Sequence, residues 1–500
     1  MEFLTDKTTQ SQLFFASSYR DLLDPGDEVW DYIKLFSEMN YKEFHAKYSG
    51  EGQSPIDPEL ILRTIFYGLQ KGIISGRKLS EACRFDVRFI ILSGSLTPDR
   101  RTLDRFFVRH EKTLEVFFKQ IVQVAMTKGL VDLKNVAVDG TRLKGHTKSS
   151  GSSYDSMKRA KEYIAENLKK LASDLEGDRE TEKQAEILGE MKLESSRTKK
   201  IDRAIDQIEK EDKDMQKTSK NRNPIGDRKK SLNDPEALEM SYRSNSRAYM
   251  FGYNPQVAVD EKNQIILACH LHDKATDYQA LKPVLDQVEE VTGSHPESVL
   301  CDAGYNSQEN ICAVYGDGMA PIFAAKSVYE TDQERPHAFE QLTYDSSTDV
   351  YHCLAGQQLS YFKRNRGEKS EVKLPKGCDL CLRSPECIFF KNKTKTLVVP
   401  NAKSFEQMKK HVHATRTEIY KKHYAVRKKI VEPVFGNIKH NKRFMLNVRG
   451  RARVSTRFLC ICIAHNIEKL LGQRLRPVLN YLIRWTKTLF AIREEVFILA

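Results

Sequence analysis

The sequence lacks the long apolar runs and the secretory signal pattern that are typical of membrane and exported proteins. Its 500 residues contain no apolar run long enough to span a bilayer. The start, from Met1 to Lys7, lacks the basic segment and apolar core of a secretory signal. We therefore expect a cytoplasmic protein with no membrane partner.

Cysteine and tryptophan are also scarce. Of ten cysteines, six stand singly in apolar surroundings, the usual setting of reduced core thiols. These six are Cys83, Cys269, Cys301, Cys312, Cys460 and Cys462. The two tryptophans, Trp30 and Trp485, lie far from every carboxylate motif described below, so the sequence nominates no base-stacking residue.

Positive charge is in excess. The chain carries 81 Lys and Arg against 68 Asp and Glu, a formal net charge of +13, and its pI is about 9.0. An extended polyanion is attracted to such a surface through counterion release, which makes nucleic acid the leading class of partner. With 40% hydrophobic residues the chain can bury a sizeable core, and its length favours more than one domain.

Two apolar runs each end in an aspartate that is followed closely by glycine. Residues 135–141 read Asn-Val-Ala-Val-Asp-Gly-Thr, and residues 298–305 read Ser-Val-Leu-Cys-Asp-Ala-Gly-Tyr. Both patterns predict a buried strand that delivers its carboxylate, Asp139 or Asp302, to the exposed end. A third candidate, Glu432, lies in a basic segment with a helical pattern. The three could converge on divalent cations.

The surroundings of Glu432 leave some questions open. Pro433 disfavours the α conformation at the preceding residue, so the helix should either kink there or restart at Pro433. A face that combines Glu432, Gly436 and Lys439 would let the backbone approach a phosphate. Three further carboxylates near the expected core could replace an assigned ligand. They are Asp260, Asp273 and Asp277.

The N-terminal residues 1–130 contain repeated helical patterns. Within them, Ser75–Cys83 and Thr97–Phe106 each predict a turn that enters a short helix. Two interpretations remain open, a basic helical bundle or a helix-turn-helix-like unit that holds three arginines near phosphates. These arginines are Arg100, Arg101 and Arg105.

The middle of the chain changes character twice. Residues 151–235 are rich in Lys and Glu and predict two or three long surface helices, either simply solvated or running along a duplex. Residues 236–340 predict a hairpin, an amphipathic helix and the Asp302 strand. This order suits an α/β fold whose RNase H-like core is a mixed sheet with flanking helices. We expect the following parts: an N-terminal all-helical DNA-binding domain (1–130), core segments (131–150, 236–340 and 401–475), a charged helical insertion (151–235), a Cys-rich insertion (341–400) and a C-terminal helix (476–500).

Four cysteines cluster in the insertion 341–400. Cys378 and Cys381 are spaced C-x2-C, and Cys353 and Cys387 bracket them. The pattern predicts a small zinc knuckle in which four thiolates close the coordination sphere, so the Zn2+ would be structural. Reduced surface thiols are the alternative.

The most basic stretch of the chain follows Glu432. Its cations are expected to bind the backbone phosphates of a nucleic acid. They are Lys439, Lys442, Arg443, Arg449, Arg451, Arg453 and Arg457. Two apolar helices, around residues 458–471 and 478–492, should close the fold.

Taken together, these motifs resemble those of bacterial insertion-sequence DDE transposases, of the IS1182 family related to IS5 and IS4. The resemblance covers nearly the whole length. Besides the N-terminal turn-and-helix patterns, it rests on Val138–Thr141, on Gly252–Asn254 with Ala258–Asp260, on Asp302–Tyr305 and on Val431–Lys439.

The resemblance implies a mechanism and a set of partners. Asp139, Asp302 and Glu432 would hold two Mg2+ (or Mn2+) ions that activate water, then a DNA 3′-hydroxyl, for attack on phosphodiester bonds. The partner would be double-stranded DNA, as the terminal inverted repeats of the element and as target. A homodimer on DNA and association with the bacterial nucleoid are further expectations.

The resemblance also implies DNA-binding roles for Tyr424 and Arg427 upstream of the glutamate and for Lys439 after it. The interval from Arg427 to Glu432 is one residue longer than in the commonest form of this signature, so Lys428 is a rival. Two alternatives remain for the whole chain. They are a catalytically silent, transposase-derived DNA-binding protein and an RNase H-like nuclease without strand transfer.

Overall fold

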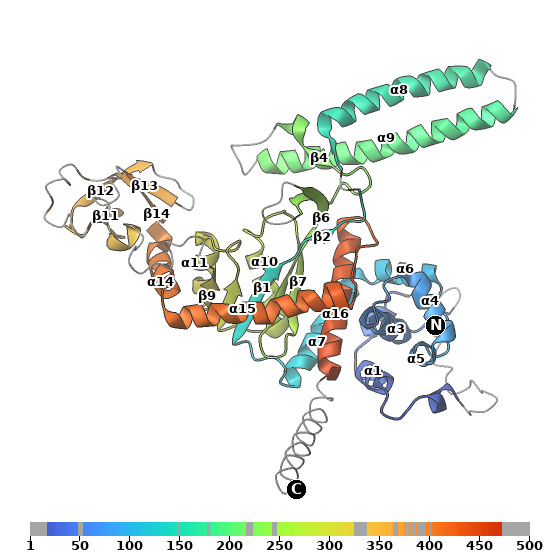
Figure 1. Ribbon diagram of the computed structural model, residues 1–500, viewed down its shortest axis with the longest axis horizontal. Coiled ribbons are helices and arrows are strands. Elements are labelled where there is room, and N and C mark those ends of the chain that lie inside the picture. The colour runs from blue at the N-terminus through green and yellow to red at the C-terminus, as the bar shows by residue number, and fades with distance from the viewer. Residues whose placement is uncertain are drawn as a thin grey trace, which may run out of the picture.

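The computed structural model describes residues 18–48, 54–148, 150–177, 181–216, 224–242, 248–324, 338–363, 369–373, 375, 378, 381, 387, 396–400 and 402–472. A mixed sheet forms the centre, and three parts project from it (Figure 1). These parts are a group of N-terminal helices, a long helical hairpin and a small second sheet. No helix among the described residues is both long and apolar enough to cross a lipid bilayer.

The central sheet has seven strands. Strands β6 and β7 form the predicted hairpin, β6 is antiparallel to β1, and β8 and β9 run parallel to β1. The strand bounds are β1 Asn135–Gly140, β2 Leu143–Lys144, β5 Leu238–Ser241, β6 Tyr249–Asp260, β7 Ile266–His272, β8 Ser298–Cys301 and β9 Ala320–Phe323. The order across the sheet is β7-β6-β1-β8-β9, with β2 and β5 paired to the first half of β6.

The pairing of β1 with β8 fixes the position of both aspartates. The two strands are parallel, and Ala137 pairs with Leu300. Asp139 and Asp302 each lie two residues beyond this pair, so both carboxylates come to the same edge of the sheet. Val136, Ala137 and Val138 are fully buried, as expected for a strand that is covered on both faces.

Helices from distant parts of the chain cover this sheet. They are α7 (Glu111–Thr127), α10 (Leu281–Thr292), α11 (Gln308–Gly316), α15 (Glu418–Gly436) and α16 (Arg451–Gly472). The side chain of Asn466 on α16 donates to the Ile266 carbonyl and accepts from the Ile266 amide, at 2.8 Å each. This exchange replaces strand pairing at the edge of β7 and protects it. The predicted helix 458–471 is confirmed as part of α16; the predicted helix 478–492 lies outside the described residues.

Helix α15 runs without a break through Pro433. Of the two alternatives, the restart at Pro433 is therefore wrong. Proline has no N–H for the carbonyl four residues earlier, which belongs to Lys429. Gln264 Nε2 donates to that carbonyl at 2.9 Å and supplies the missing hydrogen bond. A π-helical turn, η6 (Asn437–Asn441), follows α15 directly.

The described N-terminal residues are helical, as predicted. The elements are η1 Tyr19–Leu22, α1 Glu28–Ser37, α2 Lys42–His45, α3 Pro58–Gln70, α4 Gly76–Phe85, α5 Val87–Leu92 and α6 Arg100–Arg109. Asp57 caps α3 by accepting from the Glu59 amide, and Pro58 occupies its first turn. The hydrophobic cluster of these helices continues through α7 and α16 into the sheet. The domain boundary at residue 130 stays a prediction.

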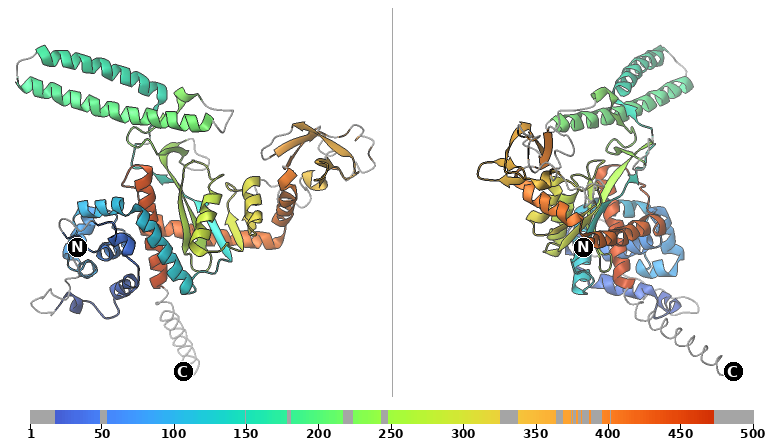
Figure 2. Two further views of the ribbon diagram at one scale, coloured as in Figure 1. Left: turned by 180° about the vertical axis from the view of Figure 1, so that it is seen from behind. Right: turned by 60° about the vertical axis from the view of Figure 1, so that its left-hand side comes forward.

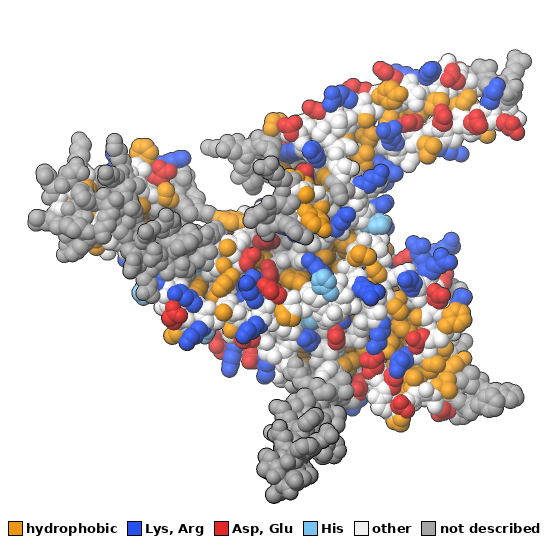
Figure 3. Space-filling view, in the orientation of Figure 1, with side chains coloured by type: hydrophobic (Ala, Val, Ile, Leu, Met, Phe, Trp, Pro, Cys, Tyr) orange, Lys and Arg blue, Asp and Glu red, His pale blue; other side chains and the backbone are white. Residues whose placement is uncertain are grey.

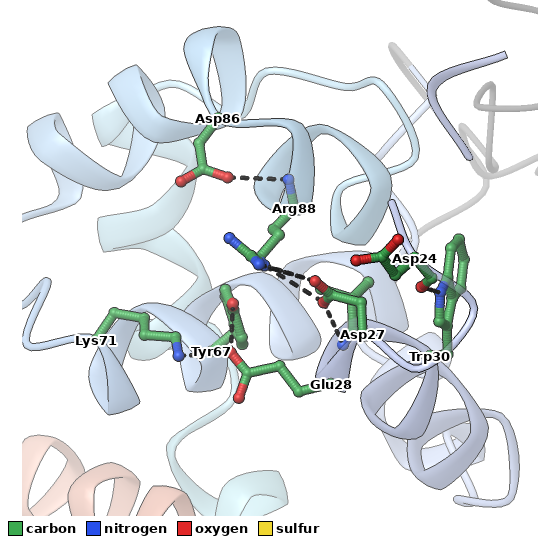
Figure 4. Close-up of polar contacts among 9 residues, drawn as sticks. Asp24, Asp27, Glu28, Trp30, Tyr67, Lys71, Asp86 and Arg88 are labelled. Carbon is green, nitrogen blue, oxygen red and sulfur yellow. Dashed lines mark hydrogen bonds and ion pairs between the residues drawn. The ribbon is translucent and has the colours of Figure 1, made fainter. Parts of the chain in front are cut away.

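A polar network links α1 to α3 and α5 (Figure 4). Asp27 caps α1 through the Val29 amide and forms an ion pair with Arg88 of α5 at 2.8 Å. Its neighbour Glu28 accepts a hydrogen bond from the Tyr67 hydroxyl of α3 at 2.8 Å. Burial alone would raise the pKa of Asp27, but Arg88 and the Val29 amide outweigh it and lower that pKa.

The charged insertion is a hairpin of two long helices, α8 (Tyr154–Gly177) and α9 (Thr181–Gln216). It projects from the central sheet in both views of Figure 2. The two helices share a small apolar cluster of their own, which includes Met157, Ile164 and Ile201. At the base lie β3 (Ser152–Ser153), η2 (Ile225–Asp227) and β4 (Lys229–Lys230).

The Cys-rich insertion contains an antiparallel sheet that the sequence analysis did not predict. Its strands follow chain order: β10 Thr343–Asp345, β11 Val350–His352, β12 Gln358–Lys363, β13 Lys369–Lys373 and β14 Thr396–Pro400. Short helices η3 (Ala338–Gln341) and η5 (Ala402–Ser404) and helix α14 (Phe405–Thr415) adjoin it. Tyr351, Val399 and Phe405 are fully buried in a separate hydrophobic cluster.

The Asp27 network yields a stability prediction. Asp27→Ala removes an N-cap and leaves Arg88 without its carboxylate, so it should lower the free energy of unfolding by about 1 kcal/mol at neutral pH. Because the folded pKa lies below 3.8, the contribution should be present above that pH and lost as the pH falls through the folded value. Chemical denaturation at neutral and acidic pH measures both effects.

Asp24→Ala is the matched control. Asp24 takes part in the network through its backbone carbonyl, which accepts from Trp30 Nε1 at 2.9 Å. The control should change stability by less than about 0.5 kcal/mol. Equal losses in the two variants would contradict the role assigned to Asp27.

Candidate active site

A polar cavity of about 580 Å³ opens at the edge of the sheet where β1 and β8 end. Asp139, Asp302 and Lys439 all line it, together with Asp277, one of the three further carboxylates named from the sequence. The other lining residues are Gly140, Thr141, Arg142, Lys144, Tyr242, Met250, Asn254 and Ala275. Predicted residues from three distant segments therefore meet at one place.

Asp139 is partly buried, and both of its carboxylate oxygens accept hydrogen bonds. Its Oδ1 accepts from the Gly140 amide at 2.9 Å, and its Oδ2 accepts from Arg427 Nη1 at 2.9 Å. Burial raises the pKa of Asp139 to about 6; Arg427 opposes this rise, and the charge of Asp302 adds to it. The buried Nε of Arg427 has no hydrogen-bond partner among the described residues, so this guanidinium keeps an unused donor beside the cavity.

Asp302 follows the last residue of β8 directly and is half-buried. Its Oδ1 accepts from the Gly304 amide at 2.8 Å. A Cβ added to Gly304 would lie 3.0 Å from that oxygen, tighter than ordinary van der Waals contact. Glycine at this position therefore leaves the carboxylate accessible.

Of the three further carboxylates, only Asp277 lines the cavity. Asp260 is fully buried at the opposite end of β1, opposite Val136, and accepts from the backbone amides of Leu133 and Lys262. The side chain of Asp273 is 69% exposed. Asp260 thus has a structural role in the fold, while Asp277 lies beside the two predicted ligands.

Glu432 is exposed on α15 and does not line the cavity. The same helix does bring Arg427 to Asp139. The π-helical turn after it brings Lys439 into the cavity, where Nζ donates to the Thr141 hydroxyl. Burial lowers the pKa of Lys439, against the opposing influence of Asp139. The segment 427–439 therefore contributes two positively charged side chains, Arg427 and Lys439, to the site, and Glu432 lies between them in the sequence.

The donor chemistry of the cavity fits a hard divalent cation. Among the described residues no group of three or more His, Cys, Asp or Glu side chains is arranged to hold a metal ion. Mg2+, however, usually binds through one or two carboxylates and keeps several waters, with substrate phosphates completing the shell. Asp139 and Asp302 line the cavity with two carboxylates of this kind.

Two family models match the chain. One, described as a transposase DDE domain, covers residues 352–471 and so includes Arg427, Glu432 and Lys439. The other, described as a transposase domain (DUF772), covers residues 17–109 and includes α6. The chain is an insertion-sequence DDE transposase. The pairing of the two domains is consistent with the IS1182 family, in agreement with the resemblance described above. No curated protein and no solved structure matches the chain.

The predicted zinc ligands of the transposase lie in the second sheet and the segments beside it. None of the four is in a disulfide bond, and all are partly exposed. The amide of Cys381 donates to the Cys378 carbonyl at 3.2 Å, which closes the tight turn expected of C-x2-C. Cys353 and Cys387 pack against the hydrophobic cluster of that sheet. Zinc binding stays a prediction.

The arginines of the N-terminal domain lie on the surface. Arg100, Arg101 and Arg105 are all exposed on α6, and Figure 3 shows Lys and Arg side chains gathered over this helix. Arg100 forms one ion pair within the helix, with Asp104 at 3.3 Å. These arginines are therefore available to a polyanion, under either interpretation of the helices.

The basic stretch after the π-helical turn divides into two groups. Arg443 and Arg449 are exposed, and Arg449 Nε donates to the His146 carbonyl at 2.9 Å. Arg451 instead donates to the carbonyls of Leu271 and His272 at the end of β7. Arg457 pairs with Asp104 and lies 3.6 Å from the Phe107 ring centroid. Several cations predicted to bind phosphates are thus engaged in holding the fold together.

Tyr424 is partly buried and packs against the main hydrophobic cluster. Sequence reasoning missed a polar network on β6, in which Asn254 and Gln256 hold Asp277. A signal was present, because these two polar residues alternate within an otherwise apolar strand and must face the same side of the sheet.

The ion pair at Asp139 yields a prediction for metal binding. Arg427→Gln removes the charge that opposes the rise in the pKa of Asp139, so that pKa should move up by roughly one unit or more. Protons would then compete with a divalent cation at higher pH. The acid limb of the Mn2+ affinity profile, which is the pH range over which affinity falls on acidification, should therefore shift to higher pH. Mn2+ titrations as a function of pH measure this shift.

Arg443→Gln is the control, since it removes an exposed arginine of the same segment. It should leave the acid limb where it is in the unmodified transposase. An identical limb in the Arg427 variant would show that the guanidinium does not control the ionisation of Asp139.

Proposed function

We propose that the transposase binds the ends of its insertion sequence and cleaves and joins DNA at the cavity between β1 and β8, with Mg2+ or Mn2+ as cofactor. One observation carries this proposal. The parallel register of β1 and β8 brings Asp139 and Asp302 to one cavity, which also receives a cation from the DDE-domain segment, Lys439. The strand order and directions support an RNase H-like core.

The residues of the cavity have distinct roles in this proposal. Divalent cations, when bound, supply Lewis acidity and an activated water or DNA 3′-hydroxyl for attack on a phosphodiester. Asp139 and Asp302 hold them. Arg427, which pairs with Asp139 at 2.9 Å, exchanges this carboxylate for a DNA phosphate when the cations bind. Lys439 neutralises charge on the DNA strand beside Thr141.

Glu432 completes the ligand set in this proposal. It is exposed on α15, the helix that also carries Arg427. Its carboxylate is free of ion pairs among the described residues, so no such pair has to be broken when a cation beside Asp139 recruits it. The proposal thus requires a movement of the Glu432 side chain or of α15 when DNA and cations bind.

DNA recognition is divided between two surfaces. The exposed arginines of α6 read the ends of the element, while Arg443 and Arg449 bind backbone phosphates near the cavity. A homodimer on DNA provides one active site for each end. The four clustered cysteines hold a structural Zn2+ that stabilises the insertion.

The ligand assignment predicts the behaviour of three isosteric variants. Asp139→Asn, Asp302→Asn and Glu432→Gln should each abolish cleavage and joining of element ends, because an amide keeps the shape but loses the charge that holds a hard cation. Binding to the same DNA should be nearly unchanged. Gel assays of cleavage and strand transfer, beside a binding titration, measure these outcomes.

Asp273→Asn and Glu418→Gln are matched controls, since both remove an exposed carboxylate of the same type from the same part of the chain. Both should keep activity. Robust cleavage by any of the three ligand variants would remove that residue from the site, and cleavage without joining by the unmodified protein would favour a nuclease.

The two DNA-binding surfaces predict different salt dependences. Arg443→Ala with Arg449→Ala should weaken binding to element ends and to random duplex alike, and should reduce the log-log salt slope by roughly one unit for each phosphate that is no longer neutralised. Arg100→Ala with Arg101→Ala should weaken binding to element ends more than to random duplex. Affinities at several salt concentrations distinguish the two patterns.

Arg451→Ala serves as the comparison, because this arginine holds the end of β7. It should lower the melting temperature and leave the salt slope alone. If the Arg443 and Arg449 variant behaves like the Arg451 variant, the phosphate-binding role is wrong.

A further inference from the structure

Asp277 is held by only one of its two carboxylate oxygens. Oδ1 accepts from Asn254 Nδ2 and from Gln256 Nε2, at 2.8 Å each. No ion pair of Asp277 occurs among the described residues, in contrast to Asp139 and its partner Arg427. The carboxylate therefore lies in the cavity without an ion-pair partner among the described residues and keeps Oδ2 available.

The groups that hold Asp277 are rigid. Gln256 and Tyr305 are fully buried, and Asn254 is 3% exposed. The Tyr305 hydroxyl donates to Gln256 Oε1, which orients the amide so that its NH2 group faces Asp277. A buried amide is costly unless hydrogen-bonded, so this network has little freedom to rearrange. Asp277 is thus fixed by the core of the sheet.

The available oxygen lies across Gly304 from Asp302. A Cβ added to Gly304 would lie 3.0 Å from Asp302 Oδ1 and 3.5 Å from Asp277 Oδ2. The two oxygens therefore flank one point at the mouth of the cavity, and the absence of a side chain on Gly304 keeps that point open. The space between two carboxylate oxygens is suited to a hydrated cation.

We propose that Asp277 is a positioning residue for the transposition reaction, in which its Oδ2 accepts a hydrogen bond from a water of the divalent cation held by Asp302. The proposal rests on the metal-dependent function proposed above. Mg2+ gives up its waters reluctantly, so a fixed acceptor beside them orients the hydrated ion. Such outer acceptors typically contribute roughly 10- to 100-fold to metal affinity or activity.

Asp277→Asn tests the proposal. Asparagine keeps the oxygen that accepts from Asn254 and Gln256, so the network and the fold should persist, while the charged Oδ2 is replaced by a donor. We expect Mn2+ to bind the full chain about tenfold more weakly, measured by calorimetry without DNA. Asp273→Asn, four residues earlier and exposed, makes the same charge change and should leave the Mn2+ affinity unchanged.

Gly304→Ala provides a second test that alters no charge and applies even if the Asp277 variant fails to fold. Its methyl group would intrude between the two carboxylates and should also weaken Mn2+ binding. Unchanged Mn2+ affinity in either folded variant, or an equal loss in the Asp273 control, would overturn the role of Asp277.

The failure of this inference can be distinguished from failure of the proposed function. If Asp302→Asn loses Mn2+ binding and cleavage while Asp277→Asn keeps both, only the role of Asp277 is wrong. If Asp302→Asn keeps both, the proposed metal site itself is wrong, and the inference is overturned with it.

Discussion

The structure depends on one backbone interaction, the parallel pairing of β1 with β8. It joins segments more than 160 residues apart and sets Asn135 opposite Ser298. Because both strands are buried on both faces, their register is fixed, and a shift of β8 by one residue would turn Asp302 away from the cavity that Asp139 lines. The surrounding elements, from the hairpin of β6 and β7 to helix α16, protect this pairing and cover the sheet.

Helix α15 is the second requirement, and its continuity is maintained by the sheet. Pro433 would otherwise leave the Lys429 carbonyl without a donor, and Gln264 at the turn after β6 supplies one. The helix and its π-helical turn then bring Arg427 to Asp139 and Lys439 to Thr141. π-helical turns are often found at functional sites. The positions of Arg427 and Lys439 are thus set by the helix that carries Glu432 and by the turn that follows it.

The sequence was informative where its pattern was local and periodic. It predicted the strands of Asp139 and Asp302, the β6 and β7 hairpin, the helical N-terminal part and the long helices of the charged insertion. It left open whether α15 passes through Pro433, because the compensating donor, Gln264, lies far away in the chain. The same limit applies to Arg451 and Arg457, whose partners His272 and Asp104 are brought to them only by folding. The strands of the Cys-rich insertion are short and mostly polar, so their periodicity was too weak to detect.

The central claim is that Asp139 exchanges a protein cation, Arg427, for a divalent metal ion when DNA is bound. The most direct measurement is a crystal structure of the transposase with an element end and Mn2+, in which anomalous scattering locates the metal. The account predicts a Mn2+ ion ligated by Asp139 and Asp302, Glu432 drawn toward it, and Arg427 on a DNA phosphate. A Mn2+ ion bound elsewhere, with the ion pair of Asp139 and Arg427 intact, would contradict it.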